Sequence, residues 1–344
     1  MAKAPVESPR ARLAALLRAA HGRRVVVLGD LIADEYVSGR IARVSREAPV
    51  LILEYDSTDI RPGGAGNAAR NVAALGGAAS LVALAGRDEP GRRVLAAFPR
   101  GVDTRQVVRP AGYHTPVKTR ILAGGIHSAK QQVVRIDRHA GEPIAERWRA
   151  AWLQRAARAL RGADAVLVSD YGSGLVSPAI VAALVRPLRE RRRPVPVLVD
   201  SRYDLLRYRG LTACTPNESE VEAALGTTIG DRPRALERAG RAILARTRMD
   251  AVLVTRGSRG MALFEPGAPT VHVPIYGSDE IADVTGAGDT VMATLTLALA
   301  AGATMAEAAR LANYAGGLVV MKRGTATVSA RELGRAVAAD AALA

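Results

Sequence analysis

This sequence contains very little cysteine and few aromatic residues. Its 344 residues include one cysteine, and Phe, Trp and Tyr together make up 3% of the chain. A single cysteine, Cys214, excludes an internal disulfide and a cysteine-based metal site, and it favours the reducing cytoplasm as the compartment. With so few aromatic rings, the core has to be built mainly from Ala, Val and Leu.

Long apolar runs and several familiar motifs are also missing. No uninterrupted apolar stretch reaches the roughly 18 residues that a membrane span needs. The apolar part of residues 9–20 is short and contains Arg18, so it predicts an amphipathic helix rather than a signal peptide. The phosphate-binding pattern G-x-x-x-x-G-K-[ST] is absent. The five histidines do not have the spacing of a metal hydrolase.

Acidic residues are outnumbered by basic ones, and the formal net charge is +15. Such an excess can indicate a nucleic-acid-binding protein. Here, however, the basic residues are spread along the chain, and the densest cluster, residues 189–193, ends a predicted helix, where cations are favoured. No finger, basic zipper or RNA-binding motif is visible. We therefore expect no specific nucleic-acid partner, and we attribute the charge to attraction of anionic metabolites.

Short apolar runs alternate with helical patterns through most of the chain. The runs predict buried strands at residues 24–28, 79–85, 165–168, 195–199 and 251–254. The helical patterns lie at residues 148–160, 177–189 and 232–245. This alternation predicts a mostly parallel sheet covered by helices on both faces. The polar residues Asp30, Asp170, Asp200 and Thr255 follow strands, so we expect a ligand site at that edge of the sheet.

Two segments break this alternation. Residues 50–58 and 115–137 predict strands with no helix between them, which indicates a small β lid over the site. After residue 283 the chain is expected to be entirely helical. We therefore predict one α/β domain over residues 1–344, with lid segments inserted at about residues 36–60 and 104–137.

The strongest motif is DVTGAGD, residues 283–289, directly before a predicted helix. Gly286 and Gly288 allow a tight turn, and the first N–H groups of the helix form an anion site with the helix dipole. Asp289 in such a site can accept a proton from an attacking hydroxyl, while the loop steadies a transferred phosphoryl group. The same residues also suit an ordinary helix N-cap.

A second motif is PGGAGNAARN, residues 62–71. Gly63 and Gly64 permit close approach of a sugar, and the Asn67 amide can both donate to and accept from hydroxyls. The residues also match the G-x-G-x-x-A pattern of dinucleotide folds, but that pattern should directly follow the first strand, and here it does not.

Together the two motifs, in this order and far apart, resemble the ribokinase-like (PfkB) carbohydrate kinase family, from about residue 25 to 333. The resemblance implies a ribokinase-like three-layer α/β sandwich with a mostly parallel sheet and a β lid. It implies ATP as co-substrate, Mg²⁺ as cofactor, Asp289 as the base, and an anion hole of Gly286, Ala287 and Gly288. Some family members place a monovalent cation such as K⁺ near the positions of Asp283 and Gly324, and the sequence leaves that open. The lid edge would be the natural surface of a homodimer.

The resemblance assigns the remaining site residues by position. Those expected to bind the sugar substrate are Asp30, Asp34, Gly63, Gly64, Asn67, Lys118 and Asp170. Those expected to bind the nucleotide are Asn217, Thr255, Gly257, Gly260 and Asn313. Glu220 and Asn217, in the pattern N-x-x-E, would hold Mg²⁺ through water.

A closer resemblance is to kinases of D-glycero-β-D-manno-heptose 7-phosphate. It rests on GDLIADEY (29–36), SREAPV (45–50), SDYGSG (169–174), RYRG (207–210) and TPNESE (215–220). It implies phosphorylation of the anomeric hydroxyl to give the 1,7-bisphosphate, by a stand-alone kinase domain because no HxGH motif follows. Three departures concern the sugar: Arg202 stands where those kinases usually have Lys, Gly66 replaces a residue with a side chain, and residues 123–132 match poorly. The alternatives are a kinase for another sugar, sugar acid or nucleoside, and a non-catalytic sensor of sugar or nucleotide.

Overall fold

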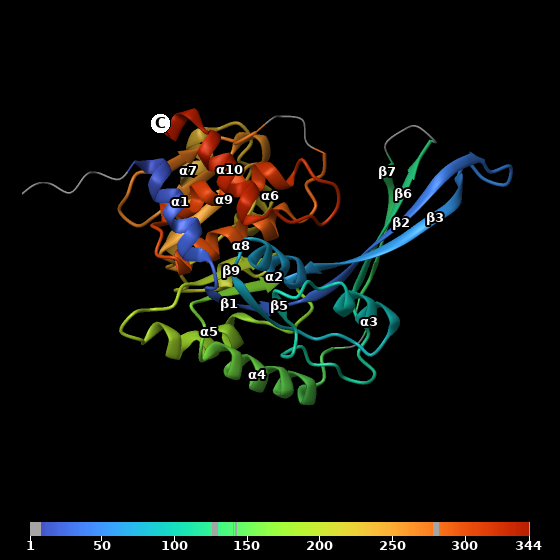
Figure 1. The fold of residues 1–344 in the computed structure, drawn as a ribbon, viewed down its shortest axis with the longest axis horizontal. Helices are drawn as coiled ribbons and strands as arrows, with labels where there is room; N and C mark the ends of the chain where they lie inside the picture. The colour runs from blue at the N-terminus through green and yellow to red at the C-terminus, as the bar shows by residue number, and fades with distance from the viewer. Residues whose placement is uncertain (1–7, 126–129, 140, 142, 278–281, 344) are drawn as a thin grey trace, which may run out of the picture.

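The structure, a computed structural model, describes residues 8–125, 130–139, 141, 143–277 and 282–343. In these residues the strands form two sheets, and the larger has the order β13-β12-β11-β10-β9-β8-β1-β4-β5 (Figure 1). Its strands are β1 (Arg24–Gly29), β4 (Ala78–Val82), β5 (Val102–Asp103), β8 (Ala165–Asp170), β9 (Val197–Ser201), β10 (Ala213–Cys214), β11 (Ala251–Thr255), β12 (Met261–Phe264) and β13 (Val271–Val273).

From β5 to β11 every neighbouring pair in the main sheet is parallel. Strands β12 and β13 continue the sheet in antiparallel pairing. The central strands β1 and β8 are almost entirely buried, as expected for a parallel sheet covered on both faces. The predicted strands are confirmed, whereas the short strands β5, β10, β12 and β13 were not predicted.

Helices cover both faces of this sheet, so the molecule has three layers. The core on one face takes side chains from α1 (Pro9–Ala20), α2 (Ala65–Ala74), α8 (Ala287–Ala300), α9 (Met305–Val319) and α10 (Ala330–Ala339). The core on the other face takes side chains from α4 (Glu146–Leu160), α5 (Pro178–Arg189), α6 (Glu218–Leu225) and α7 (Pro233–Thr247). The predicted three-layer α/β architecture is therefore confirmed. Within the described residues, no helix combines the length and apolar character that crossing a membrane would require.

Helix starts follow from local sequence signals. Pro lies in the first turn of α1, α5 and α7, where its missing N–H costs nothing. Asn217 and Glu220 form a reciprocal capping box at α6, and Thr304 with Glu307 forms another at α9. These caps fix where α6 and α9 begin, and α6 begins at the edge of the sheet where the parallel strands end.

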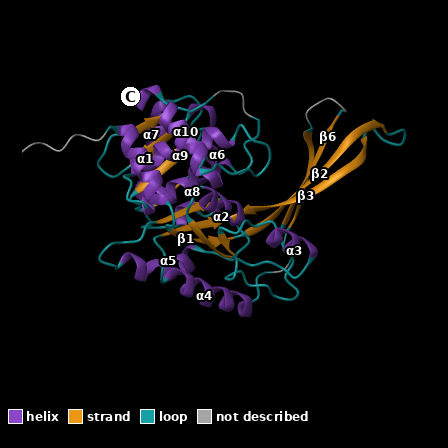
Figure 2. Ribbon diagram, in the orientation of Figure 1, coloured by secondary structure: helices purple, strands orange, loops and turns teal. Residues whose placement is uncertain are grey.

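The second sheet is the lid, with the strand order β3-β2-β6-β7. It consists of β2 (Leu31–Val44), β3 (Leu51–Gly64), β6 (Val117–Gly124) and β7 (Gln131–Arg138), and α3 (Glu89–Ala96) packs near its base. Figure 2 shows these strands extending away from the helical layers. The pairing of β2 with β6 is parallel, whereas the outer pairs are antiparallel.

The lid differs in extent from the sequence prediction. It begins directly after β1, and the predicted segment 104–116 is not part of it, since Val108 bridges Leu84 beside the main sheet. Residues 126–129 of the predicted lid lie outside the described residues. Several large apolar side chains of the lid are exposed, namely Ile41, Val44, Leu51, Tyr55, Val133, Val134 and Ile136.

Candidate active site

Asp289 lies in the first turn of α8, at the edge where the parallel strands end. Gly286 precedes the helix in a left-handed conformation (φ 76°), and a Cβ there would lie 2.5 Å from the Asn67 amide nitrogen. The Asn67 amide donates to Asp289 Oδ2 (2.9 Å), and the Tyr171 hydroxyl donates to Asp289 Oδ1 (3.2 Å). Both oxygens of this buried carboxylate therefore have a hydrogen-bond donor.

Burial dominates the electrostatics of Asp289. It raises the pKa of this carboxyl to about 7, although the hydrogen bonds from Asn67 and Tyr171 favour the ionised form. A group with this pKa is ready both to accept and to release a proton near neutral pH.

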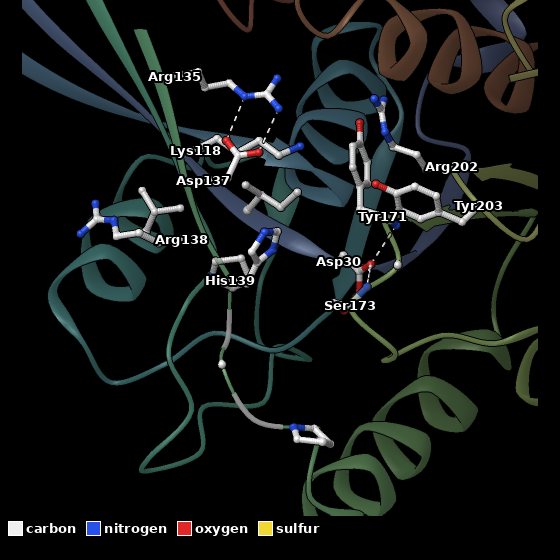
Figure 3. A pocket seen from close by; sticks show the side chains of 16 residues that line it. Asp30, Lys118, Arg135, Asp137, Arg138, His139, Tyr171, Ser173, Arg202 and Tyr203 are labelled. Carbon is white, nitrogen blue, oxygen red and sulfur yellow. Dashed lines mark hydrogen bonds and ion pairs between the residues drawn. The ribbon is translucent and has the colours of Figure 1, made fainter. Parts of the chain in front are cut away.

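Two neighbouring cavities lie at this edge of the sheet, and Asp289 lines one of them. The helix cavity, of about 450 Å³, lies over the start of α8 and is lined by Gly286, Ala287, Gly288 and Asp289 among others. The lid cavity, of about 590 Å³, lies between the lid and the main sheet. Tyr171 and Arg202 line both cavities, so their side chains stand at the boundary between them (Figure 3).

The helix cavity brings together the residues predicted to bind nucleotide and metal. Its lining includes Asn217, Glu220, Thr255, Gly257, Gly260 and Asn313. These residues come from separate segments of the sequence, and all of them face the same space as Asp289.

Individual residues of this cavity are held in place by local contacts. Asn313 is buried and its amide donates to the Pro274 carbonyl (2.8 Å), so its side chain does not lie in solvent. Asn217 Oδ1 accepts from the Glu220 N–H (2.9 Å), and Glu220 Oε2 accepts from the Asn217 N–H (3.0 Å). The N–H of Ala287 donates to the Val284 carbonyl (3.2 Å), which leaves it less free to bind an anion than the sequence suggested.

Carboxyl groups outnumber basic side chains in the lining of the helix cavity. Burial and the neighbouring charges of Glu220 and Asp289 raise the pKa of Asp200 well above its usual value. Burial also raises the pKa of Glu220, whose nearest cation, Arg202, lies 4.0 Å away. Three carboxyl groups around one cavity suit a divalent cation. The described residues contain no group of three His, Cys, Asp or Glu side chains placed to hold a metal directly, so the fit is to a hydrated ion.

In the lid cavity, basic side chains outnumber carboxylates. Its lining includes the basic side chains of Lys118, Arg135, Arg138 and Arg202, together with His139 (Figure 3). Arg135 is paired with Asp137 (2.9 Å), and Arg138 is paired with Glu35 (2.9 Å). The Lys118 ammonium lies 4.7 Å from the centre of the Tyr171 ring. This cavity can therefore attract an anionic ligand.

Asp30 lines the lid cavity, as expected for a substrate-binding residue, but it also has a structural role. It accepts hydrogen bonds from the N–H groups of Tyr171 (2.8 Å) and Ser173 (3.3 Å) and from the Ser173 hydroxyl. The carboxylate thereby anchors the turn that follows β8.

Several predicted sugar contacts are different in the structure. Asp34 is paired with Arg120 (2.5 Å) in a buried contact, and Asp170 accepts from Ser201 and Tyr208 (2.8 Å each). Neither lines the lid cavity. Both carboxylates are occupied by neighbouring side chains of the protein.

The glycine-rich motif also makes its close contacts within the chain. A Cβ on Gly63 would lie 2.2 Å from Asp34 Oδ2, and one on Gly64 would lie 2.5 Å from the Asp30 carbonyl. Asn67 turns its amide toward Asp289 rather than into the lid cavity. The motif therefore makes room for the carboxylates of the site and orients one of them.

The sequence left open whether a monovalent cation binds near the loop before α8. Asp283 accepts from the N–H groups of Thr285 (2.9 Å) and Gly324 (2.8 Å), so the structure brings Asp283 and Gly324 together. Burial alone would raise the pKa of Asp283, but these hydrogen bonds hold it below its usual value.

Sequence reasoning did not identify Tyr171 as a site residue. One indication of its role was present in the sequence: Tyr171 directly follows Asp170, the last residue of a strand that ends at the site. The direction of its ring toward Asp289 depends on the turn held by Asp30, which sequence periodicity does not describe.

Comparisons with known proteins agree with this geometry. A profile described as pfkB family carbohydrate kinase matches residues 23–332. The bifunctional protein HldE of Trichlorobacter lovleyi is 43% identical over 336 residues, which cover 96% of this chain and 66% of that protein. The protein of the same name from Caulobacter vibrioides is 43% identical over 324 residues, covering 93% of this chain and 65% of that protein. The chain thus spans slightly less than two thirds of the length of these relatives.

Solved structures with low sequence identity share the fold. Phosphofructokinase-2 from Escherichia coli in complex with fructose-6-phosphate has a TM-score of 0.71 at 19% identity, covering 92% of this chain and 98% of that chain. Arabidopsis thaliana ribokinase complexed with ribose and ATP has a TM-score of 0.69 at 21% identity, covering 92% of this chain and 99% of that chain. The expected ribokinase-like fold is confirmed.

Proposed function

Because this chain belongs to the pfkB family of carbohydrate kinases, and is thus an ATP-dependent sugar kinase, we propose that its acceptor is a sugar phosphate. The proposed reaction transfers the γ-phosphoryl group of ATP to the anomeric hydroxyl of D-glycero-β-D-manno-heptose 7-phosphate. One observation carries the proposal: Asp289 lines a cavity rich in carboxyl groups and accepts a hydrogen bond from Tyr171, which also lines the neighbouring cavity rich in basic side chains.

Each cavity has a proposed occupant. ATP binds in the helix cavity, with its adenine near Asn313 and its phosphates near the start of α8. The sugar binds in the lid cavity, where Asp30 accepts from hydroxyls and Lys118, Arg138 and Arg202 attract the phosphate that the sugar already carries. The resemblance to heptose 7-phosphate kinases, residue by residue around Asp30, Tyr171 and Asn217, supports this choice of sugar.

The chemistry follows from this arrangement. The anomeric hydroxyl loses its proton to Asp289 as its oxygen attacks the γ-phosphorus. A new oxygen–phosphorus bond forms, the bond from the γ-phosphorus to the β–γ bridging oxygen breaks, and ADP leaves. Backbone N–H groups at the start of α8 steady the charge on the transferred group. Mg²⁺, held through water by Glu220 and Asn217, would neutralise charge on the ATP phosphates.

The substrate is tested by measuring ATP consumption with a panel of acceptors. The panel contains heptose 7-phosphate, unphosphorylated heptose, ribose, fructose, fructose phosphates, a ketodeoxy sugar acid and adenosine, with and without Mg²⁺ and with K⁺ or Na⁺. We expect turnover with heptose 7-phosphate and much weaker turnover with heptose, since the lid cavity attracts the phosphate. Turnover with a different acceptor would discard the heptose assignment. If no acceptor in the panel caused ATP consumption while the protein still bound ATP, a non-catalytic role would be favoured.

The rate should depend strongly on pH near neutrality. Asp289 accepts a proton only when it is ionised, and its pKa is raised to about 7, chiefly by burial. Below that pKa, we expect kcat to rise about tenfold for each pH unit, and above it we expect a plateau. A pH profile of kcat, flat between pH 5.5 and 8 (roughly the range where a base with this pKa must titrate), would contradict the assignment of the base.

We also propose that the lid mediates a homodimer. Its exposed apolar side chains, among them Ile41, Tyr55 and Ile136, lie on strands that project from the body (Figure 1). Covering such a surface with a second copy would remove it from water. Sedimentation that finds a monomer at micromolar concentration would contradict this part of the proposal.

A further inference from the structure

We infer that Tyr171 is a positioning residue for the catalytic base, whose hydroxyl holds the Asp289 carboxylate in the orientation needed for proton transfer. The inference rests on the proposed role of Asp289. It concerns a residue that lies between the two cavities and whose side chain contacts both the base and the lid.

The main chain of Tyr171 is fixed on both sides. Its own N–H donates to Asp30 Oδ2 (2.8 Å), and the N–H of Gly172 donates to Asp170 Oδ1 (3.0 Å). The tips of β1 and β8 therefore hold this turn through two carboxylates. A side chain that starts from such a rigid point can place its hydroxyl reproducibly.

The ring of Tyr171 is held as well. The Lys118 ammonium, on lid strand β6, lies 4.7 Å from the ring centre. On another side, a Cβ at Gly64 would lie 3.3 Å from Tyr171 Cε2, so the glycine allows the ring to lie close to the main chain. These contacts leave the hydroxyl directed at Asp289 Oδ1 (3.2 Å).

Asn67 supplies the matching contact on the other oxygen. Its amide donates to Asp289 Oδ2 (2.9 Å), and Asn71 donates to the Asn67 carbonyl oxygen (3.1 Å). With one donor on each oxygen, the carboxylate plane is defined from both sides. Each oxygen keeps a second lone pair, with which it can accept a proton from a sugar hydroxyl.

The charged groups around Asp289 come from several elements, and their effects oppose one another. The charge of Asp34 disfavours the ionised form of Asp289, whereas the charge of Lys118 favours it. The negative charge of Asp289 also raises the pKa of Asp200, because two carboxylates repel each other. Glu220 and Arg202 line the same cavity. Burial favours the neutral acid form of Asp289. Two uncharged hydrogen-bond donors, the Asn67 amide and the Tyr171 hydroxyl, favour its carboxylate form. Tyr171 itself stays protonated, since burial and the nearby carboxylates raise its own pKa well above the usual value.

The test is the substitution Tyr171→Phe, which removes the hydroxyl and keeps the ring. The pKa of Asp289 is read without any substrate, from the carboxyl ¹³C signal of labelled aspartate, assigned by its loss in Asp289→Asn. We expect the pKa to rise by about one pH unit, because a hydrogen bond to a charged group is lost. The acid limb of the kcat profile should move by the same amount, so that kcat falls about tenfold at pH 6 and recovers at pH 9.

Tyr314→Phe is the matched control. Tyr314 is also buried and donates to a carboxylate, that of Asp340, but it lines neither cavity. It should leave the acid limb where it is. An unchanged pKa of Asp289 in Tyr171→Phe, or a loss of rate that is equal at every pH, would overturn the inference. Full turnover in Asp289→Asn would instead show that the proposed base is wrong.

Discussion

Asp289→Asn should lower kcat by about 10²-fold to 10⁴-fold while leaving ATP affinity nearly unchanged. The amide cannot accept the proton of the attacking hydroxyl, yet it has almost the same size. Its oxygen can accept from the Asn67 amide, and its NH2 can donate to the Tyr171 hydroxyl, which is able to accept as well as donate. The start of α8 and the lining of the helix cavity remain in place, so the nucleotide keeps its contacts. Turnover by coupled assay and ATP binding by calorimetry measure the two quantities separately.

Asp250→Asn provides the control for a change of one charge. Asp250 directly precedes β11, at the end of the sheet opposite the site, and its side chain is outside both cavities. Its substitution should leave kcat within about twofold of the original, as for a surface change away from the site. If Asp289→Asn behaved like this control, proton transfer to Asp289 would not be part of the reaction.

Arg120→Met should lower the free energy of unfolding by about 3–5 kcal/mol, measured by denaturation in urea. Arg120 and Asp34 form an ion pair at 2.5 Å, with 10% and 6% of their side chains exposed. Removing the guanidinium leaves a buried carboxylate without its cation, at the base of the lid. Arg120 also lies 5.5 Å from the centre of the Tyr36 ring, so this packing is weakened too.

Two further variants test whether the loss of stability in Arg120→Met comes from the unpaired buried charge. Arg40→Met removes an exposed lid arginine paired with Glu54 and Asp56, and it should cost about 0–1 kcal/mol. Adding Asp34→Asn to Arg120→Met removes the orphaned charge, so the double variant should be more stable than Arg120→Met alone. A loss in Arg120→Met no larger than in Arg40→Met would mean that the buried pair contributes little.

Much of the fold was predictable because its signals are local. The apolar runs at β1, β8 and β11 and the glycine-rich start of α8 are properties of short segments, and the structure has strands and a helix there. The residues of the helix cavity could be proposed because the family resemblance assigned them, and most of them lie directly after a strand or at the start of a helix. Their meeting at one edge follows from the parallel order of the sheet.

The lid cavity was harder to predict because the partners of its side chains come from strands that are distant in the sequence. Asp34 and Asp30 are close in sequence and equally polar, yet Asp34 pairs with the buried Arg120 while Asp30 lines the cavity. The choice depends on the parallel register that sets Asp34 beside Lys118 on β6, far along the chain. Tyr171 was missed for the same reason, since an aromatic residue after a strand gives no sign of the carboxylate it will face.

The division of the site at Tyr171 also has an evolutionary consequence. The walls of the lid cavity come largely from the inserted strands and the turn after β8, whereas those of the helix cavity come from later segments of the chain. Substitutions that alter the choice of acceptor can therefore accumulate in one part of the gene while nucleotide use is preserved by another. A fold arranged in this way can acquire new acceptors without having to rebuild its phosphate donor site.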